Sequence, residues 1–203
     1  LNHVSTTFVF GWSTKETLYE GDANEDMALL DFGYSQSKWV SEQLVLAAIE
    51  RGLPARIFRP ALITPTVSGD GYNFDIAIRL LAFMLHHGIT TTAQNQVSFT
   101  PADIAAHNLV AISRLPDTLG KTFHMTRDAF ASLEEITRIM GELTGTEFVS
   151  YGVGDFVSTM IERCRKGDLL FPLVSFFVRS ADNITAMEFK RYDSQSYRTA
   201  RAR

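Results

Sequence analysis

The sequence has very little cysteine and no long hydrophobic run. Cys164 is the only cysteine in 203 residues, which excludes an internal disulfide and a zinc site built from several cysteines. No apolar run reaches the roughly 18 residues that a membrane span needs. The nearest is LLFPLVSFFV at 169–178, which contains Pro172. Because no signal peptide is visible either, we expect a cytoplasmic protein with no membrane partner.

Basic residues are not in excess. The chain has 19 lysines and arginines against 23 aspartates and glutamates, a formal net charge of -4. This balance argues against a nucleic-acid binder that works by neutralising phosphate charge. Hydrophobic residues make up 45% and charged residues 21%, as in an ordinary globular protein. The length suits one domain with a substantial core, or one domain with a small additional lobe.

Short predicted strands alternate with predicted helices along the chain. Strands are expected at 3–11, 55–63, 97–99, 121–125 and 147–152, and helices at 35–51, 74–87, 102–115 and 132–145. Residues 12–33 are expected to form a long polar loop. The alternation predicts an α/β fold with a parallel sheet. Because the strands are few and the chain opens directly in one, we expect a partial Rossmann-like sheet whose N-terminal nucleotide-binding half is missing.

The stretch GYSQSKWVSEQL places Tyr34 four residues before Lys38. On a helix these two side chains lie on one face. A nearby ammonium favours the phenolate form, so it lowers the pKa of a tyrosine from about 10 and makes it a usable acid or base. Ser5, Thr6 and Thr7 offer hydroxyls near the end of a predicted strand, where active sites of α/β proteins lie. The spacing alone also fits a solvated helix face.

Four stretches in this order resemble the extended short-chain dehydrogenase/reductases. They are VSTTFVFG, GYSQSKWVSEQLV, RGLPARIFRPALI and TPADIAAHNLVAIS, which together cover roughly residues 3–115. Within that family they are most similar to thioester reductase domains. Such domains terminate nonribosomal peptide and polyketide synthetases, carboxylic acid reductases and aminoadipate reductases.

The resemblance implies a role for each motif. Thr6 would hydrogen-bond the substrate carbonyl, and Tyr34 would donate the proton. Lys38 would tune Tyr34 and bind the nicotinamide ribose. Pro60, Ala61, Leu62 and Ile63 would line the nicotinamide. The implied reaction is reduction of a carrier-bound acyl thioester to an aldehyde, or on to an alcohol, by NADPH rather than NADH. The implied partner is an acyl or peptidyl carrier protein with a phosphopantetheine arm.

The chain departs from the family in one respect. The family holds the cofactor pyrophosphate on a glycine-rich turn after its first strand. No Gly-x-Gly-x-x-Gly occurs here; after Gly152-x-Gly154, Val157 stands where the third glycine belongs. Two other functions therefore stay open: another extended enzyme, such as a sugar epimerase or ketone reductase, and a non-catalytic fragment that binds an acyl-carrier partner.

We assign residues 1–125 to a partial catalytic region with interleaved substrate-lobe segments, and 126–203 mainly to a substrate-binding lobe and tail. We expect no metal site, because neighbouring side chains of His86 and His87 diverge by about 100° on a helix. His3 and His124 are expected to be hydrogen-bonded core residues. Asp103 is expected to be a helix N-terminal charge rather than a substrate-binding group, and Asn73 and Asp75 either to cap the next helix or to face substrate or cofactor. The 169–178 stretch is expected to be core rather than the lining of an acyl pocket, and Arg201 and Arg203 to be a solvated tail.

Overall fold

The computed structural model describes residues 1–13, 15–24, 26–30, 32–71, 74–93, 96–127, 129–186 and 191–203. The chain divides into two compact units, and each unit is built from separated segments. Unit 1 comprises Leu1–Gly71, Ser98–Ala129 and Lys190–Arg203, and unit 2 comprises Tyr72–Val97 and Phe130–Phe189. The C-terminal segment thus belongs with the first residues of the chain. The catalytic role expected for residues 1–125 and the substrate-binding role expected for residues 126–203 remain predictions.

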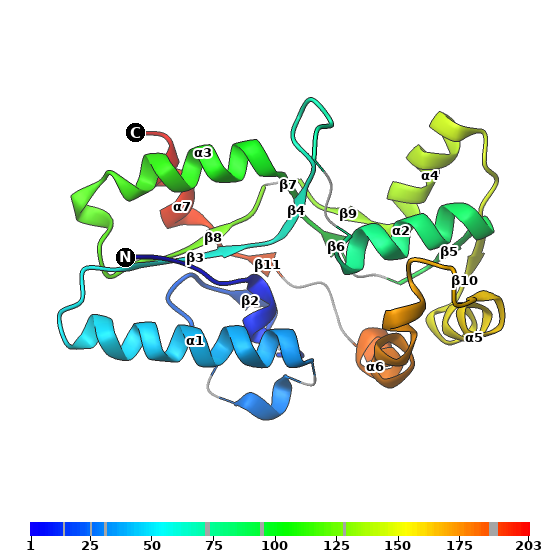
Figure 1. The fold of residues 1–203 in the computed structure, drawn as a ribbon, viewed down its shortest axis with the longest axis horizontal. Coiled ribbons are helices and arrows are strands. Elements are labelled where there is room, and N and C mark those ends of the chain that lie inside the picture. The colour runs from blue at the N-terminus through cyan, green and yellow to red at the C-terminus, as the bar shows by residue number, and fades with distance from the viewer. Residues whose placement is uncertain are drawn as a thin grey trace. The chain divides into compact units, whose positions relative to one another are not determined.

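Unit 1 is built on a parallel sheet with the strand order β1-β3-β8. The strands are β1 (Asn2–Val4), β3 (Arg56–Pro60) and β8 (Thr122–Met125). Helices α1 (Gly33–Glu50) and α3 (Ala102–Ser113) cover opposite faces of the sheet (Figure 1). The predicted α/β class is therefore confirmed. The smaller elements of the unit are η1 (Thr7–Phe10), β2 (Thr17–Leu18), η2 (Met27–Leu29), β4 (Leu62–Thr64), β7 (Phe99–Pro101), η3 (Pro116–Thr118), β11 (Arg191–Tyr192) and α7 (Gln195–Arg201).

The first strand is shorter than predicted. Instead of running over 3–11, β1 ends at Val4, and Thr7–Phe10 form the 3-10 helix η1. The Thr6 hydroxyl caps this turn by accepting a hydrogen bond from the Phe8 amide at 3.2 Å. A threonine that bonds its neighbouring backbone in this way competes with the strand ladder. The β-branched and aromatic composition of the stretch therefore indicated a strand. The cap that Thr6 forms favours a turn instead.

The predicted helix α1 is confirmed, but its buried face is not the expected one. Val40 and Leu44, two members of the apolar repeat that indicated the helix, are 44% and 69% exposed. The buried positions are Ser35 and Glu42, and Trp39 packs on a cluster of Val9, Phe10 and Leu18. Polar contacts on this inner face hold the helix in place, so an apolar repeat in the sequence could not identify the buried face.

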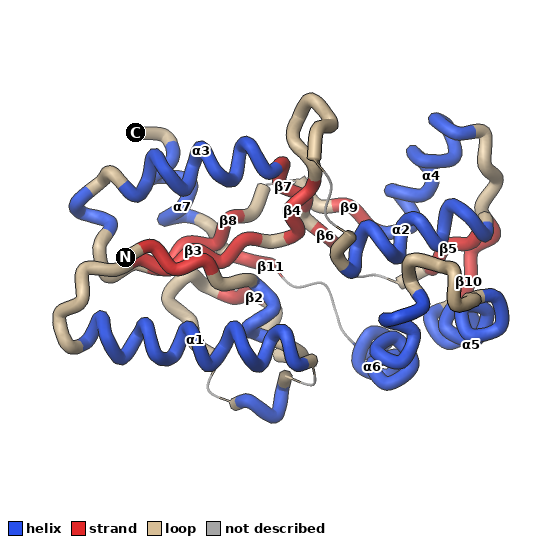
Figure 2. The backbone as a smooth tube through the Cα atoms, viewed as in Figure 1, coloured by secondary structure: helices blue, strands red, loops and turns tan. Residues whose placement is uncertain are grey.

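Unit 2 is mainly helical, with two short two-stranded sheets (Figure 2). Its nine-membered buried cluster is apolar: Leu80, Phe83, Met84, Ile89, Phe156, Met160, Cys164, Leu170 and Phe177. Two members come from the 169–178 stretch, as predicted. The elements are α2 (Ile76–His87), β5 (Ile89–Thr91), β6 (Gln96–Val97), β9 (Ala131–Ser132), α4 (Leu133–Thr144), β10 (Val149–Tyr151), α5 (Val153–Arg163), η4 (Phe171–Leu173) and α6 (Val174–Ala186).

Side-chain caps fix where helices of unit 2 begin. Asp75 Oδ1 accepts a hydrogen bond from the Ile78 amide at 3.0 Å, and Ser132 Oγ accepts one from Glu135 at 3.1 Å. Helix α4 then ends at Gly145, whose positive φ of 74° is the left-handed conformation that favours glycine. The predicted capping role of Asp75 is confirmed, whereas Asn73 lies outside the described residues.

Arg201 and Arg203 are exposed, as predicted, but the segment before them is a packed helix and not a tail. Residues Gln195–Arg201 form α7, in which Tyr197 and Ala200 are buried. The Tyr197 hydroxyl accepts a hydrogen bond from Asn108 of α3 at 2.7 Å, and Arg203 forms an exposed ion pair with Asp117. The basic composition concealed two buried positions, Tyr197 and Ala200, on this helix. Among the described residues, no helix is both long and apolar enough to cross a membrane.

Candidate functional site

The carboxyl ends of β1 and β3 lie side by side at one edge of the sheet. The strands are in register with Val4 opposite Phe58, and the Ser5 amide donates to the Phe58 carbonyl at 2.7 Å. Thr6 therefore follows β1 at the same edge where Pro60 ends β3. Carboxyl edges of parallel strands are where α/β proteins place ligands. Two of the sequence motifs are thus brought together by the sheet itself.

Three hydroxyl residues follow β1, and all three are buried. The Thr7 hydroxyl hydrogen-bonds the buried phenol of Tyr192, whose pKa burial raises to about 12. Thr6 Oγ1 accepts a bond from Phe8, which leaves its O–H available to donate. Ser5 Oγ is buried and has no hydrogen-bond partner among the described residues. The edge therefore offers two hydroxyls, Thr6 and Ser5, for a polar group of a ligand.

Tyr34 and Lys38 lie one turn apart at the start of α1. Lys38 Nζ donates to the Val4 carbonyl at 3.1 Å, which places the ammonium at the end of β1, two residues before Thr6. An ammonium has three donors, so two remain for other acceptors. Tyr34 is 46% exposed, and its ring lies 6.2 Å from that of Phe32. The structure thus brings Lys38 to the sheet edge and leaves the Tyr34 ring accessible.

The residues predicted to line a nicotinamide connect β3 to β4. Pro60 ends β3 opposite Met125, and the Ala61 amide donates to the Met125 carbonyl at 3.3 Å. Leu62 and Ile63 open β4, which pairs with β7. All four side chains from Pro60 to Ile63 are half-buried. The connection is therefore fixed by backbone pairing on both sides, and it leaves apolar surface at the carboxyl edge.

Sequence reasoning missed the buried network that holds α1 in place. The Arg59 guanidinium of β3 forms a bidentate ion pair with Glu42 of α1, and their side chains are 1% and 2% exposed. The guanidinium also donates to the Asp22 carbonyl at 2.9 Å and lies 4.8 Å from the Phe10 ring centroid. A charge inside a predicted buried strand was the one signal that could have revealed this network.

Two further buried groups extend this network. The Glu20 carboxylate accepts hydrogen bonds from the amides of His124, Ser196 and Tyr197. Burial raises the pKa of Glu20. His124 is fully buried, and its Nδ1 lies 2.8 Å from the Asp193 carbonyl. Burial, and secondarily the Arg59 charge, lower the pKa of His124 to about 3. The prediction of a hydrogen-bonded core histidine is confirmed for His124.

His3 behaves differently from His124. It lies in β1, but its Nε2 is buried without a hydrogen-bond partner among the described residues. Burial lowers the pKa of His3, whereas the nearby Glu42 carboxylate acts in the opposite direction. The prediction of a hydrogen-bonded histidine is therefore wrong for the Nε2 atom of His3.

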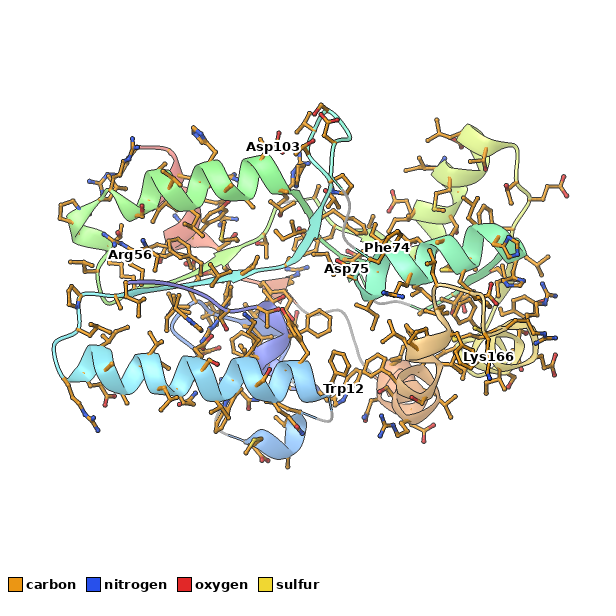
Figure 3. The ribbon with its side chains drawn as sticks, in the orientation of Figure 1. Trp12, Arg56, Phe74, Asp75, Asp103 and Lys166 are labelled. Carbon is orange, nitrogen blue, oxygen red and sulfur yellow. The ribbon has the colours of Figure 1, made fainter. Side chains whose placement is uncertain are left out.

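Asp103 lies in the first turn of α3, as predicted, and it also binds a loop. Its carboxylate accepts from the Val67 amide at 3.2 Å and 3.4 Å, which ties the start of α3 to the 65–71 turn. Figure 3 shows the labelled Asp103 side chain beside that turn. The contacts therefore support a structural role for Asp103 at the start of α3.

The structure fits the nicotinamide end of a dinucleotide better than its phosphate end. The Lys38 ammonium, the unpaired Ser5 hydroxyl and the half-buried Pro60–Ile63 surface suit a ribose and an apolar ring. Strand β10 leads through Gly152-Val153-Gly154 directly into α5, but Val157 stands where the third glycine of a phosphate-binding turn belongs. Gly152 caps α5, and a Cβ at Gly152 or Gly154 would meet nothing within 4 Å. No neighbouring atom therefore comes so close to either position that only glycine would fit there.

An open groove of unit 2 is not lined by the aromatic 169–178 stretch. Its volume is about 770 Å³. Its walls come from β5, α4, β10 and the residues around them: Thr90, Ser132, Glu134, Glu135, Thr137, Arg138, Gly141, Thr146, Phe148 and Ser150. Eight of these ten residues have polar or charged side chains, so this groove does not have the predominantly hydrophobic lining of an acyl pocket.

Comparison with solved structures defines the class of the fold. The terminal R domain of the myxalamid PKS-NRPS biosynthetic pathway is 26% identical, with a TM-score of 0.87 over 98% of this chain and 51% of that chain. A thiolation-reductase di-domain of an archaeal nonribosomal peptide synthetase shares the fold at 19% identity, with a TM-score of 0.68 over 86% of this chain and 39% of that one. The fold is that of the extended short-chain dehydrogenase/reductases.

The family follows from the sequence comparison. The NAD-binding family described as "Male sterility protein" matches residues 1–109, and the chain belongs to this family. The nonribosomal peptide synthetase asaC of Aspergillus flavus is 38% identical over 97 residues, which are 47% of this chain and 10% of that protein. The chain therefore spans about half of the solved R domain and a small part of this curated relative. The predicted resemblance to thioester reductase domains is confirmed.

Proposed function

We propose that the chain carries the proton-donor side of an enzyme that reduces a carrier-bound acyl thioester to an aldehyde. The observation that supports this most is the meeting of Thr6, Lys38 and the Pro60–Ile63 connection at one carboxyl edge of the parallel sheet. The R domain with a TM-score of 0.87 to this chain belongs to a PKS-NRPS pathway. We assign to this chain the same class of substrate, an acyl group on the phosphopantetheine arm of a carrier protein.

The side chains have separate roles in this proposal. The Thr6 hydroxyl, whose oxygen already accepts from Phe8, donates to the thioester carbonyl. Tyr34 gives its proton to the oxygen that becomes negative as the carbonyl is reduced. Lys38, anchored on the Val4 carbonyl, directs its remaining donors to a ribose and lies one helical turn from Tyr34. When bound, NADPH would supply the hydride. Collapse of the resulting hemithioacetal releases an aldehyde and a free thiol.

Replacing Tyr34 by phenylalanine tests the assignment. In the natural polypeptide that carries this chain, Tyr34→Phe should lower thioester reduction by about 10²–10⁴-fold, the usual contribution of general acid catalysis. Tyr19→Phe is the matched control, because Tyr19 is also an exposed tyrosine, at 56%, but does not lie on α1. Following NADPH oxidation in both variants checks this. Unchanged activity in Tyr34→Phe would refute the role.

A second function is favoured by one observation, the lack of a complete Gly-x-Gly-x-x-Gly turn in the sequence. In it, this chain alone is a non-catalytic module that binds an acyl-carrier partner. Titrating NADPH into the 203-residue chain, with fluorescence of the cofactor as the signal, separates the two cases. Weak or absent binding is expected if this chain lacks a phosphate site. Tight binding would show that phosphates are held without a glycine turn.

A further inference from the structure

Three metal-ligating side chains meet in unit 2, outside the site described above. His86 and His87 are the last two residues of α2, and Asp168 lies in the turn that follows α5. One ligand atom from each residue lies within 4.8 Å of the other two. We propose that His86, His87 and Asp168 bind one divalent transition-metal ion, such as zinc, which joins the end of α2 to this turn.

The sequence alone argued against such a site. Neighbouring residues on a helix point about 100° apart, and no further ligand stands near the histidine pair in the sequence. In the structure the two imidazole rings nevertheless have their centroids 4.7 Å apart, at an interplanar angle of 82°. The fold brings the third ligand from a segment far along the chain. The juxtaposition is therefore a tertiary feature that local spacing could not reveal.

One of the distances between ligand atoms is close to the value that a zinc site requires. His87 Nε2 and Asp168 Oδ1 lie 3.8 Å apart. With zinc bonds of about 2.0–2.2 Å, two ligand atoms of a tetrahedral site lie about 3.4 Å apart. His87 Nε2 is also buried and has no hydrogen-bond partner among the described residues. A buried nitrogen of this kind is costly unless something binds it, and a metal ion placed towards Asp168 would do so.

The two better-buried ligands are held in place by other contacts. The His87 ring packs on Phe83, with centroids 4.3 Å apart, and the His87 carbonyl accepts from Arg163 at 3.1 Å. Asp168 Oδ2 accepts from the Arg165 amide at 2.6 Å, and the Asp168 amide donates back to the Arg165 carbonyl. Oδ1 is the oxygen that faces His87. Preorganised ligands of this kind lose little freedom when a metal binds.

The ligand types select the class of metal. Two imidazoles with one carboxylate suit zinc and its neighbours in the transition series, whereas magnesium and calcium prefer oxygen ligands alone. A fourth position is left for water. The charges of Arg163 and Arg165 oppose a cation, so we expect moderate rather than very tight binding. Figure 3 labels Lys166 in the same turn.

Calorimetric titration of the chelator-treated chain with zinc tests the proposal. We expect one zinc ion per chain and a higher midpoint of thermal unfolding when zinc is present, because the ion binds the folded state. Asp168→Asn and His86→Gln should each weaken binding by about tenfold or more, since loss of outer-shell partners alone has that effect in metal sites. His107→Gln and Asp182→Asn, exposed residues outside the cluster, are the matched controls and should bind zinc like the original chain.

Two results would overturn the proposal. One is the lack of saturable binding of one zinc ion by the folded chain. The other is equal zinc affinity in the original chain and in either cluster variant. His86 is exposed, so His86→Gln keeps the test valid if Asp168→Asn fails to fold. Circular dichroism of each variant establishes folding before the titration.

Discussion

The two units keep their interiors together by different means. Unit 1 buries ionisable groups that bond other side chains and the backbone: Glu20, Glu42, Arg56, Arg59 and His124. In unit 2, the buried polar side chains among the described residues are hydroxyls of threonine and serine, and the main cluster is apolar. Hydrogen bonds and ion pairs are directional, so they determine where a helix lies and which way it faces. Apolar packing determines mainly the volume that the buried side chains fill. The unit with the predicted proton donor is the one with directional bonds.

Breaking the buried ion pair should give the largest loss of stability. Arg59→Met leaves the Glu42 carboxylate buried without its partner, so the free energy of unfolding should fall by about 3–5 kcal/mol. Urea denaturation measures this change. The control is Arg138→Met, which removes an exposed pair with Glu142 and should change stability by less than about 0.5 kcal/mol.

A double variant sharpens the same comparison. Glu42→Leu combined with Arg59→Met removes both charges, so it should recover much of the stability that Arg59→Met alone loses. If the double variant is as unstable as the sum of the two single variants, the pair does not act as a unit.

Removing apolar volume from unit 2 should have a comparable or smaller effect. Met160→Ala deletes a fully buried side chain from the apolar cluster, so we expect a loss of about 2–5 kcal/mol. Because α1 and its network belong to unit 1, hydrogen exchange of the α1 amides should change little in the native state. Equal acceleration of exchange in α1 and in α5 would mean that the two units do not differ as described.

Near neutral pH, the smallest effect is the pH dependence from His124. Its folded pKa of about 3 lies below the ordinary value of 6.5, so the unfolded chain binds a proton that the folded chain does not. Stability should therefore fall as the pH drops below 6.5, by about 1.4 kcal/mol per pH unit until the pH nears 3. The raised pKa of Glu20 acts in the opposite direction.

Comparing the original chain with His124→Gln isolates the histidine from Glu20. Urea denaturation at several pH values between 4 and 7 should give a flatter curve for the variant than for the original chain. Parallel curves would show that His124 is not held neutral in the folded state.

Much of the fold was predictable because its signals are local. Ser132, Gly145 and Pro101 mark helix ends through their own backbone preferences, and the helices begin and end there. The strands at 56–60 and 122–125 were predictable from composition. The errors arose where distant residues decide the outcome. Strand β5 was missed because it is a three-residue strand that pairs with the distant β10.

The residues of the candidate site were predictable from the sequence, but the buried contacts that hold them in place were not. The motif order indicated Thr6, Tyr34, Lys38 and the Pro60–Ile63 connection. Nothing in the local sequence distinguishes Glu42 from a solvated glutamate of α1, because its partner Arg59 comes from a different element. The hydroxyl turn after β1 was hidden for a different, local reason: the strand-forming composition of 3–11 outweighed the cap made by Thr6.

Product analysis with three substrates tests the central claim most directly. The natural polypeptide that carries this chain is incubated with NADPH and, separately, with an acyl-pantetheine thioester, a nucleotide sugar and a ketone. The account predicts that the thioester alone is consumed, and that each aldehyde formed is matched by one free thiol and one oxidised NADPH. Turnover of the nucleotide sugar or the ketone, with the thioester left intact, would contradict it.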